Sequence, residues 1–460
     1  MLDRRRFLSS LATGLAAGVS LPFASCGRAG QTGAALAAAG DDPATGSGSL
    51  VGPDGAVDWA AVRGEFRLAP DWIHLGSFFL VSHPRPVREA IAEYRRRLDE
   101  NPLWLEEALF SSLGGGESQL DRVKQSLAGY MGGRPEEIAL TPNTTTGLAL
   151  VYNGLKIRAG QEIVTTEHDH YVHHESIRRA AEKRGASVRF VPLYDRGAAA
   201  SEDEIVERVR RALGPETRAL GVTWVHSSTG VKLPIPAIAE VVAEANAGRA
   251  EEDRCLLVVD GVHGFGVEDV DAACLGADFF VAGTHKWLFA PRGTGLVWAP
   301  AERWPQVEPT VPSFDVSSAL WTSWVEREPL PPTRASFVSP GGFIAYEHQF
   351  AVPDAVEFHQ GIGRDRIAGR IHELNGRFRE ALAEMPGITL HTPVDGRLAS
   401  GICCFEVDGM ETAEVVERLS ARRIHATASP YAEPYARVAA GIMNTPEEVE
   451  TTLAAIRELA

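Results

Sequence analysis

Short apolar segments alternate with helical segments through the middle of this 460-residue chain. We predict strands where apolar and β-branched residues run between turn residues, and helices where apolar residues recur every three or four positions. The predicted strands cover residues 138–141, 162–166, 187–191, 219–225, 255–259, 279–282 and 295–299, and the helices between them include 147–155, 174–184 and 236–247. Such alternation is typical of a mostly parallel sheet with helices on both faces, so the sequence predicts an α/β fold.

The C-terminal part of the chain has a different order of predicted elements. A long helical segment runs from Ala355 to Glu384, and the rest consists of short strands near residues 388 and 402–407 and helices at 411–421 and 446–459. A chain of this length exceeds a single simple core. We therefore expect a large domain over residues 56–345, whose N-terminal segment contributes to the site, and a smaller α+β domain over residues 346–460. Residues 305–340 are rich in proline and aromatics and are predicted to form a loop that covers the site or a partner subunit.

The N-terminus has the pattern of an export signal. Arg4-Arg5-Arg6-Phe7-Leu8 supplies a twin-arginine motif, and the weakly apolar run at 11–23 is too short for a convincing transmembrane helix. We predict a twin-arginine signal peptide over residues 1–26 and a flexible tether over residues 27–55, which would make the folded protein periplasmic or otherwise extracytoplasmic. Cys26 is a candidate for lipid attachment, and the sequence leaves ordinary cleavage and lipidation both open.

The composition limits the kinds of partner. The net charge is −16, and no run rich in Lys or Arg follows the leader. Nucleic acids and anionic membrane surfaces attract clustered positive charge, so neither is expected as a partner. Cys255, Cys274, Cys403 and Cys404 have no spacing that suggests a disulfide framework or a zinc site.

The stretch from Phe279 to Trp287 contains the strongest candidate for chemistry. Its apolar run predicts a buried strand, which is followed by Gly283-Thr284-His285-Lys286. Burial at a strand end makes an amine more easily neutral and nucleophilic toward a carbonyl. Asp260 closes the preceding predicted strand, and ligands of parallel sheets bind at the carboxyl ends of strands. We therefore expect Asp260 and Lys286 to face one crevice.

Pyridoxal 5'-phosphate explains why a lysine and a carboxylate would share that crevice. Lys286 would form a Schiff base with the aldehyde, and Asp260 would pair with the ring nitrogen and keep it protonated. Thr144-Thr145-Thr146 stands at the start of a predicted helix, where hydroxyls and free amides suit either simple capping or a phosphate. Both interpretations stay open for these threonines. His168 would offer an aromatic face above the ring.

Four histidines between two predicted elements also suggest a metal site. They are His168, His170, His173 and His174. No pattern of carboxylates or cysteines accompanies them, so we prefer one stacking histidine and several pocket or surface histidines, with no metal. The glycines Gly261, Gly264 and Gly266 are a weak match to a dinucleotide-binding loop, because no helix is predicted directly after them.

The motifs around Lys286 and Asp260 resemble those of class V aminotransferase-fold enzymes. The matching segments are Asp260-Gly261-Val262-His263, Thr284-His285-Lys286-Trp287 and Gly293-Thr294-Gly295, and further segments similar to the isopenicillin N epimerase branch are His74-Leu75-Gly76-Ser77-Phe78, Pro84-Arg85-Pro86-Val87, Asn143-Thr144-Thr145 and 227–234. The resemblance covers nearly the whole chain after the tether. It implies the fold type I of pyridoxal-phosphate enzymes, with a mostly parallel seven-stranded sheet and a smaller α+β domain, and it implies a homodimer.

The resemblance also implies roles for individual residues. Lys286 would be the Schiff-base lysine, Asp260 the partner of the ring nitrogen, and His168 the stacking residue. The other cofactor-binding positions would be Thr144, Thr145, His263, Thr284 and His285. Arg437 would clamp the substrate carboxylate, because a planar guanidinium suits a bidentate grip. Ser77 and Phe78 would lie at the substrate.

Three departures from the family pattern narrow the chemistry. Trp224 stands where relatives usually carry a polar residue, and residues 339–342 replace a turn that commonly reaches the neighbouring subunit's phosphate. No cysteine lies between His425 and Tyr435, where larger desulfurase relatives keep a catalytic thiol. Desulfurase activity of that type is therefore disfavoured.

We predict an enzyme that removes the α-proton of an amino acid through a quinonoid intermediate, with the released Lys286 as base. The outcome would be epimerisation or racemisation, or else transamination. Epimerisation needs a second proton donor, which the sequence does not identify. A C–S or C–O lyase acting on an amino acid is an alternative, and an exported binding protein without turnover is an alternative of another class.

Overall fold

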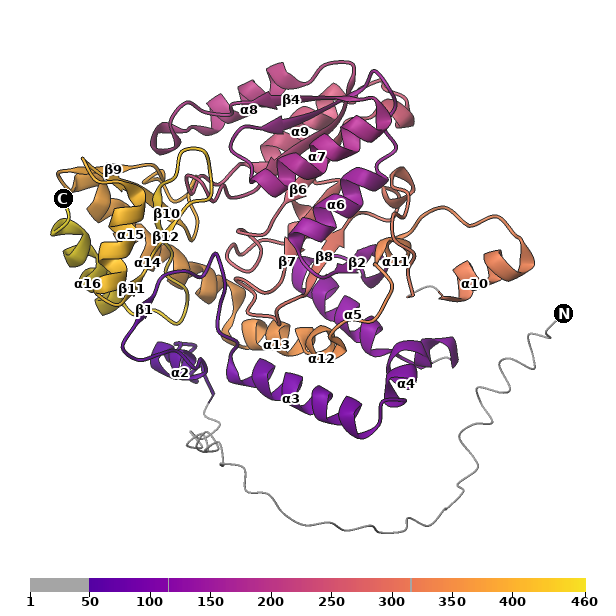
Figure 1. Ribbon diagram of the computed structural model, residues 1–460, viewed down its shortest axis with the longest axis horizontal. Coiled ribbons are helices and arrows are strands. Elements are labelled where there is room, and N and C mark those ends of the chain that lie inside the picture. Colours follow the sequence, from indigo (N-terminus) through magenta and orange to yellow (C-terminus); the bar gives the residue numbers. More distant parts are fainter. Residues whose placement is uncertain (1–48, 115, 315–316) are drawn as a thin grey trace, which may run out of the picture. The chain divides into compact units, whose positions relative to one another are not determined.

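The central sheet has seven strands and positions everything that follows. The computed structural model describes residues 49–114, 116–314 and 317–460. The strands are β2 (Ile138–Thr141), β3 (Glu162–Thr166), β4 (Ser187–Val191), β5 (Thr217–Thr223), β6 (Leu256–Asp260), β7 (Phe279–Gly283) and β8 (Gly295–Trp298). Their order is β2-β8-β7-β6-β5-β3-β4, with β8 antiparallel to both neighbours and every other pair parallel (Figure 1). The predicted α/β fold with a mostly parallel sheet is confirmed.

Helices cover both faces of this sheet. One face carries α6 (Thr144–Gly154), α7 (Tyr171–Arg184) and α11 (Ala335–Val338), and the other carries α5 (Gln119–Met131), α8 (Glu202–Ala212), α9 (Ile235–Ala245) and α13 (Val352–Ile362). In β6, Leu256 and Val258 face the first group, whereas Leu257 and Val259 face the second. Because neither face meets water, the strand is apolar at successive positions rather than at alternate ones.

Capping residues fix where the helices beside the site begin. Asn143 Oδ1 accepts a hydrogen bond from the Thr146 N–H over 2.8 Å and starts α6. His170 starts α7 in a similar way, because its Nδ1 accepts from the Val172 N–H over 3.3 Å. Both helices directly follow strands of the parallel set. Their N-termini therefore lie at the carboxyl edge of the sheet.

The C-terminal elements form a smaller antiparallel sheet with helices against it. They are α14 (Arg364–Glu384), β9 (Ile388–Leu390), β10 (Cys403–Val407), α15 (Thr412–Ala421), β11 (Ile424–His425), β12 (Thr427–Ala428), β13 (Ala436–Val438) and α16 (Pro446–Arg457). The sheet order is β12-β13-β10-β9, and all its pairs are antiparallel. In Figure 1 these orange to yellow elements lie together beside the central sheet.

The single helix expected from Ala355 to Glu384 is in fact two helices. Gly363 has a φ of 106°, a conformation that residues with a side chain rarely adopt, and it separates α13 from α14. The apolar periodicity continues across this break, so the pattern alone suggested one helix.

The N-terminal segment packs between the two sheets. Its elements are α2 (Trp59–Gly64) and β1 (Ile73–His74), and β1 pairs in parallel with β11. Phe66 and Phe78 belong to one apolar cluster with Trp287, which follows β7, and with Cys404 of β10. The segment therefore contacts both the Lys286 turn and the small sheet.

The remaining elements surround this framework. They are α3 (Arg85–Glu100), α4 (Trp104–Phe110), α10 (Ser317–Glu326), α12 (Tyr346–Phe350) and the 3-10 turns at 111–114, 135–137, 197–199, 251–253, 272–274 and 304–306. Part of the region expected as a loop, residues 305–340, forms α10 and α11, and α10 extends away from the body of the molecule (Figure 1). In the part of the chain that the structure describes, no helix is long and apolar enough to cross a membrane. The predicted signal peptide with Cys26, and residues 27–48 of the predicted tether, lie outside the described residues.

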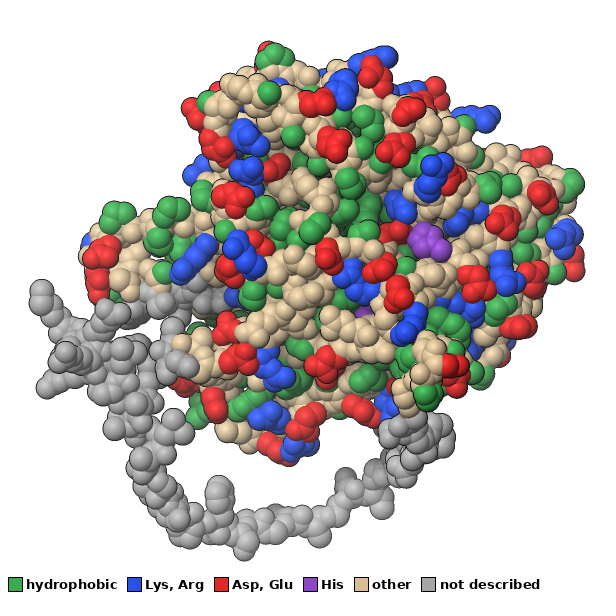
Figure 2. All heavy atoms as spheres, turned by 180° about the vertical axis from the view of Figure 1, so that it is seen from behind, with side chains coloured by type: hydrophobic (Ala, Val, Ile, Leu, Met, Phe, Trp, Pro, Cys, Tyr) green, Lys and Arg blue, Asp and Glu red, His purple; other side chains and the backbone are tan. Residues whose placement is uncertain are grey.

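Surface charges of opposite sign are paired along the helices. Arg178 contacts Glu175 at 2.7 Å, and Arg418 contacts Glu414 at 2.5 Å. Figure 2 shows Lys and Arg side chains interspersed with Asp and Glu side chains over the back of the molecule. On that face, positive charge is spread rather than gathered in one patch.

Candidate active site

The residues expected to act on a ligand follow neighbouring strands of the central sheet. Asp260 is the last residue of β6, and Lys286 lies just beyond the end of β7. His168 and His170 follow β3, the strand next to β5. Because parallel strands point the same way, their carboxyl ends meet at one edge, which is where α/β sheets bind ligands.

A hydrogen-bonded turn holds Lys286 at this edge. The Thr284 N–H donates to Thr294 O over 3.1 Å, and the Ala290 N–H donates to Thr284 O over 3.1 Å. The Thr294 hydroxyl donates to Pro291 O over 2.5 Å, so in the 2.6 Å contact between the two threonine hydroxyls Thr284 is the donor. The hydroxyl proton of Thr284, which we expected beside a phosphate, is thus used inside the turn.

Lys286 and Asp260 lie in one environment and influence each other. Asp260 is 4% exposed, and its Oδ1 accepts from the Val262 N–H over 3.1 Å. Burial raises the pKa of Asp260, whereas the charge of Lys286 lowers that pKa. Burial lowers the pKa of the half-buried Lys286, and the Asp260 carboxylate opposes that shift. The structure therefore brings the two side chains together, and burial increases the neutral, nucleophilic fraction of the amine.

His263 lies close to this pair and has an unsatisfied ring nitrogen. Its Nδ1 is buried without a hydrogen-bond partner among the described residues. Burial, followed by the charges of Lys286 and Arg437, lowers the pKa of His263 well below its usual value. A buried nitrogen of this kind calls for a partner, and the described residues do not supply one. The phenolic oxygen of pyridoxal phosphate is a chemical match for it, as the ring nitrogen is for Asp260.

The N-terminus of α6 offers donors for an anion. Asn143 occupies the Thr146 N–H, and no acceptor among the described residues is found for the N–H groups of Thr144 and Thr145. The Thr144 hydroxyl accepts from the Gly283 N–H over 2.7 Å, which joins this helix end to the end of β7. Free amides at a helix N-terminus favour a phosphate. His285, half-buried on the Lys286 turn, contacts Thr294 O through Nδ1 at 3.5 Å.

The structure separates the two histidines that follow β3. The ring of His168 stacks on Tyr194 at 3.9 Å, and its Nε2 accepts from the Leu193 N–H over 3.3 Å. The ring of His170 instead meets that of Tyr431 edge-on at 5.7 Å. Burial and the charges of Lys286 and Arg437 lower the pKa of His170 to about 4. Of these two histidines, His170 is therefore the one electrostatically linked to Lys286, although the sequence suggested it only for a metal site. His168 already has Tyr194 against one face of its ring.

The other histidines of that segment have structural partners. His173 Nε2 is 2.7 Å from the Tyr152 hydroxyl, and His174 Nε2 is 2.7 Å from Thr166 O. Within residues 49–114, 116–314 and 317–460, no group of three or more His, Cys, Asp or Glu side chains is arranged to hold a metal ion.

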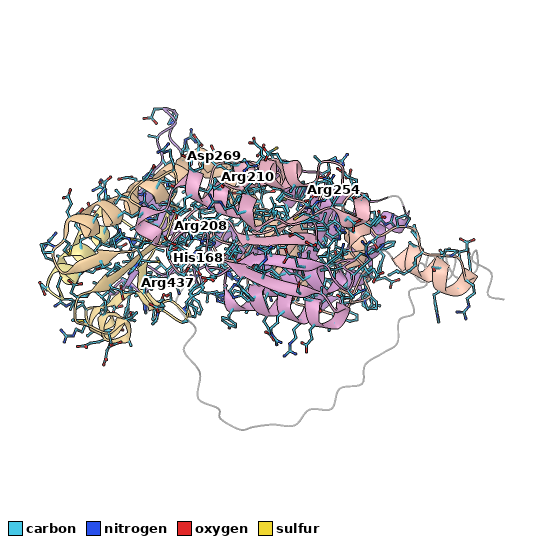
Figure 3. The ribbon with its side chains drawn as sticks, turned by 90° about the horizontal axis from the view of Figure 1, so that it is seen from above. His168, Arg208, Arg210, Arg254, Asp269 and Arg437 are labelled. Atoms are coloured by element: carbon cyan, nitrogen blue, oxygen red, sulfur yellow. The ribbon has the colours of Figure 1, made fainter. Side chains whose placement is uncertain are left out.

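Arg437 enters the same site from β13. It is 6% exposed, and its guanidinium donates to Ser227 O over 2.9 Å and to Ala428 O over 3.3 Å. The guanidinium also lies over the ring of Phe78 at 4.3 Å. No acidic side chain of the described residues forms an ion pair with Arg437. A buried cation that meets only carbonyls, hydroxyls and a ring favours an anionic ligand. Figure 3 labels His168 and Arg437 where the central sheet meets the C-terminal elements.

A cavity of about 190 Å³ lies beside Ser77, between the N-terminal segment and the small sheet. Phe79, His425 and Met443 are among its lining residues. Ser77 is buried and its hydroxyl contacts Met443 Sδ at 3.8 Å. The two N-terminal residues expected at the substrate thus lie next to the cavity (Ser77) and under Arg437 (Phe78).

The hairpin between β12 and β13 contributes Tyr431, which the sequence analysis did not identify. The Tyr431 hydroxyl is 2.8 Å from Ser227 Oγ. In contrast, Cys404 is buried, and burial raises the pKa of its thiol to about 12. Burial also raises the thiol pKa of Cys255 and Cys403, and Cys274 is exposed on a 3-10 turn after β6. None of these four thiols is on the hairpin.

Known proteins similar to this chain cover almost its full described length. The aminotransferase class-V family matches residues 83–451. Isopenicillin N epimerase of Amycolatopsis lactamdurans is 30% identical over 413 residues, which span 88% of this chain and 99% of that protein. Isopenicillin N epimerase of Streptomyces clavuligerus is 29% identical, over 86% of this chain and 96% of that protein. A probable cysteine desulfurase of Vibrio cholerae is 23% identical, over 84% and 93% of the two chains.

Solved structures share the fold at lower identity. A variant of C-DES with glycine covalently linked to its pyridoxal phosphate cofactor has a TM-score of 0.74 and 21% identity, over 86% of this chain and 99% of that one. The complex of the cystine C–S lyase C-DES with cysteine persulfide has a TM-score of 0.73 and 20% identity, over 85% and 98%. The fold type I expected from the sequence is thereby confirmed. With the family match and the mutual influence of Lys286 and Asp260, these findings establish that the chain belongs to the aminotransferase class-V family and is a pyridoxal 5'-phosphate-dependent enzyme.

Proposed function

We propose that this enzyme epimerises or racemises an amino acid by moving the proton on its α-carbon. Arg437 is the observation that carries the proposal. Its buried guanidinium lacks an acidic partner among the described residues, and its charge acts on both Lys286 and His170. A substrate carboxylate is the natural counter-ion, and binding there would bring the adjacent α-carbon toward the amine of Lys286.

Each residue of the site would have its own role in binding the cofactor or transferring the proton. Pyridoxal phosphate, when bound, acts as an electron sink for a bond broken at the α-carbon. Lys286 would hold the cofactor and then accept the α-proton, since burial favours its neutral form. Asp260 would pair with the ring nitrogen, and the Thr144 and Thr145 amides would bind the phosphate. His263 and His285 would line the cofactor, and His170 rather than His168 would cover the ring.

Two features support epimerisation over desulfuration. The hairpin on which desulfurase relatives keep a thiol carries Tyr431 here, and the Cys404 thiol is protonated at neutral pH because burial raises its pKa to about 12. The two relatives of about 30% identity are isopenicillin N epimerases. Transamination and C–S or C–O elimination need no thiol, so they are the outcomes that the experiment must separate. A non-catalytic binding protein finds no support.

The cavity beside Ser77 supports a substrate with an extended, largely apolar side chain. Its volume of about 190 Å³ suits a group of several heavy atoms, and Phe79 and Met443 contribute apolar surface. Ser77 and Phe78 would then contact the substrate between this cavity and Arg437.

The test combines deuterium exchange at the α-carbon with stereochemistry. The purified enzyme, loaded with pyridoxal phosphate, is incubated in D₂O with single enantiomers of an amino-acid panel. Epimerisation predicts deuterium at the α-carbon together with appearance of the opposite enantiomer by chiral chromatography. Formation of a keto acid, while the remaining amino acid keeps its configuration, would identify a transaminase. Release of sulfide or ammonia with pyruvate would identify a lyase. Either result overturns the proposal.

We also propose that the enzyme is an exported homodimer. The twin-arginine motif within the three arginines at positions 4–6, and the short apolar run after it, support export of the folded protein to the periplasm or another extracytoplasmic site. Cys26 is the candidate for lipid attachment. Exposed aromatic side chains support a partner subunit, since Phe343 is 82% exposed and Trp324 is 64% exposed. Cell fractionation of a variant with Arg4 and Arg5 both changed to Lys, and light scattering of the purified protein, test the two statements.

A further inference from the structure

The hairpin between β12 and β13, residues 429–435, is held rigidly. The Ser429 N–H donates to Tyr435 O over 2.9 Å, and the Tyr435 N–H donates back to Ser429 Oγ over 2.8 Å. The ring of Tyr435 stacks on His391 at 3.6 Å with an interplanar angle of 12°. These contacts close the hairpin at its base and fix where Tyr431 lies.

Tyr431 reaches from this hairpin to the residues that follow β5. Its hydroxyl lies 2.8 Å from Ser227 Oγ, and Ser227 O accepts from Arg437 over 2.9 Å. Its ring meets His170 edge-on at 5.7 Å. The phenol is half-buried, and the charges of Arg437 and Asp260 act on it. A proton-carrying group therefore stands among the side chains that would surround the substrate.

Tyr431 and Lys286 approach this site from different parts of the chain. Lys286 is carried by the turn after β7 of the central sheet, whereas Tyr431 comes from the small sheet. Building on the epimerase function proposed above, we propose that Tyr431 is the second proton-transfer residue, which serves the face of the α-carbon that Lys286 does not reach.

The proton transfers balance without any oxidant or co-reactant. In one direction the C–H bond of the α-carbon breaks and an N–H bond forms on Lys286. The Tyr431 O–H bond then breaks, and its proton forms a new C–H bond on the opposite face with the electron pair left by the first. The phenolate regains a proton from solvent, and Lys286 releases one. In the other direction Tyr431 first loses its proton to solvent and Lys286 gains one from solvent. The phenolate then accepts the α-proton, and the Lys286 ammonium gives its proton to form the new C–H bond on the opposite face.

The surroundings of Tyr431 suit this task better than those of the nearby histidines. Burial raises the pKa of Tyr431, so the phenol carries its proton at neutral pH, and the Ser227 hydroxyl and Arg437 stabilise the phenolate. His170 Nδ1 is occupied as acceptor by the Val172 N–H, and its pKa of about 4 keeps the ring neutral. His263 is buried, and burial and the charge of Lys286 lower its pKa, so neither histidine is a ready proton donor.

The activity test uses Tyr431→Phe with Tyr435→Phe as the matched control on the same hairpin. In D₂O, Tyr431→Phe is expected to keep exchange of the α-proton in the enantiomer that Lys286 serves, within a few-fold of wild type. Appearance of the other enantiomer should fall by about 10²- to 10³-fold, as for loss of a general acid. Tyr435→Phe keeps its stacking on His391 and should leave both rates unchanged.

The outcomes separate this inference from the proposed function. If the wild type epimerises and Tyr431→Phe does so at an equal rate, Tyr431 is not the second group although the function stands. If the wild type never forms the opposite enantiomer, both statements fall. Equal loss of exchange and epimerisation in Tyr431→Phe would also overturn the inference, because that pattern indicates a general role in binding.

A second measurement does not depend on catalysis. Tyrosine labelled with ¹³C at Cζ is followed by NMR against pH in the cofactor-free protein, and Tyr431→Phe identifies its signal among the eight tyrosines. Its pKa should exceed that of free tyrosine, so its signal should keep the shift of the protonated phenol at about pH 10, where free tyrosine is half ionised. A signal that is half ionised at about pH 10 would show that the phenol does not lie in the arrangement described, and would overturn the inference.

Discussion

The two walls of the active site are held together in different ways. The cofactor wall is formed by Asp260, His263, Lys286 and the start of α6. Its Lys286 turn is closed by short-range bonds between Thr284 and Thr294, and one longer-range bond, from the Gly283 N–H to the Thr144 hydroxyl, ties α6 to it. The substrate wall, formed by Phe78, Arg437 and Tyr431, depends on contacts between distant segments. Arg437 and Tyr431 both bond to Ser227, more than two hundred residues earlier in the chain. We infer that the first wall can keep its cofactor when the second is altered.

Replacement of Lys286 should have the largest effect, because it removes the covalent anchor and the base of the cofactor wall together. Lys286→Ala is expected to lose the visible absorbance of the bound cofactor and to slow α-proton exchange by about 10⁴-fold. Absorbance spectra and deuterium incorporation measure the two effects. Lys183→Ala is the control, since Lys183 is exposed and contacts Asn153 at 2.8 Å away from the site. A coloured, active Lys286→Ala variant would disprove the assignment of the cofactor wall.

Replacement of Arg437 tests whether the walls are separable. Arg437→Gln should bind the cofactor with normal absorbance, because none of its contacts is to a residue of the cofactor wall. Loss of charge-assisted hydrogen bonds worth about 1.5–3 kcal/mol should lower kcat/KM by about 10- to 100-fold, mainly through KM. Arg422→Gln is the control, since Arg422 is exposed and pairs with Glu458 at 2.7 Å away from the site. If Arg437→Gln lost the cofactor as well, the two walls would not be independent.

The sequence predicts residues whose contacts are close in the chain better than residues whose contacts join distant segments. The positions of Asp260 and Lys286 at one edge of the sheet were predictable, because Asp260 ends one apolar strand and Lys286 follows the next one within three residues. For Thr144 and Thr145 the sequence left helix capping and phosphate binding both open. Only the structure shows that Asn143 provides the side-chain cap. Arg437 depended on the resemblance to a family, since nothing in its local pattern indicates burial.

Other site residues depended on contacts that the sequence does not encode locally. His168 and His170 both follow β3 at similar spacing, and it is Tyr194 and Leu193, brought in by the chain after β4, that turn His168 away. Tyr431 lies in a short polar hairpin whose relation to Ser227 exists only once both sheets are formed. The break at Gly363 was hidden for the opposite reason, because local periodicity continues through it.

His359 tests how the cofactor wall is supported from beneath. Its Nε2 donates to Trp287 O over 2.9 Å, so the ring is neutral with Nδ1 accepting from the Tyr130 hydroxyl over 3.1 Å. His359 is 1% exposed, and burial lowers its pKa from 6.5 to about 4. His359→Gln should cost about 1–3 kcal/mol of unfolding free energy at pH 7, measured by denaturant titration.

The contribution of His359 to stability should depend on pH. A depressed folded-state pKa means that the unfolded chain binds the proton first, so the contribution of neutral His359 is complete above pH 6.5 and is lost as the pH falls from 6.5 to about 4. As the pH falls over this range, the unfolding free energy of the wild type should therefore decrease by up to about 3 kcal/mol more than that of His359→Gln. Parallel pH curves for the two proteins would contradict the neutral assignment.

Loosening the hairpin should have the smallest effect, and one confined to the substrate wall. His391 stacks on Tyr435 and contacts Glu406 Oε2 through Nε2 at 2.7 Å. An aromatic pair of this kind is worth about 0.5–1.5 kcal/mol, so His391→Ala should lower the epimerisation rate by up to about tenfold while cofactor absorbance stays normal. His391→Phe keeps the stacking surface without the Glu406 contact and should recover most of the rate. If His391→Phe is as slow as His391→Ala, the contact with Glu406 rather than the stacking orders the hairpin, and the position of Tyr431 depends on charge instead of packing.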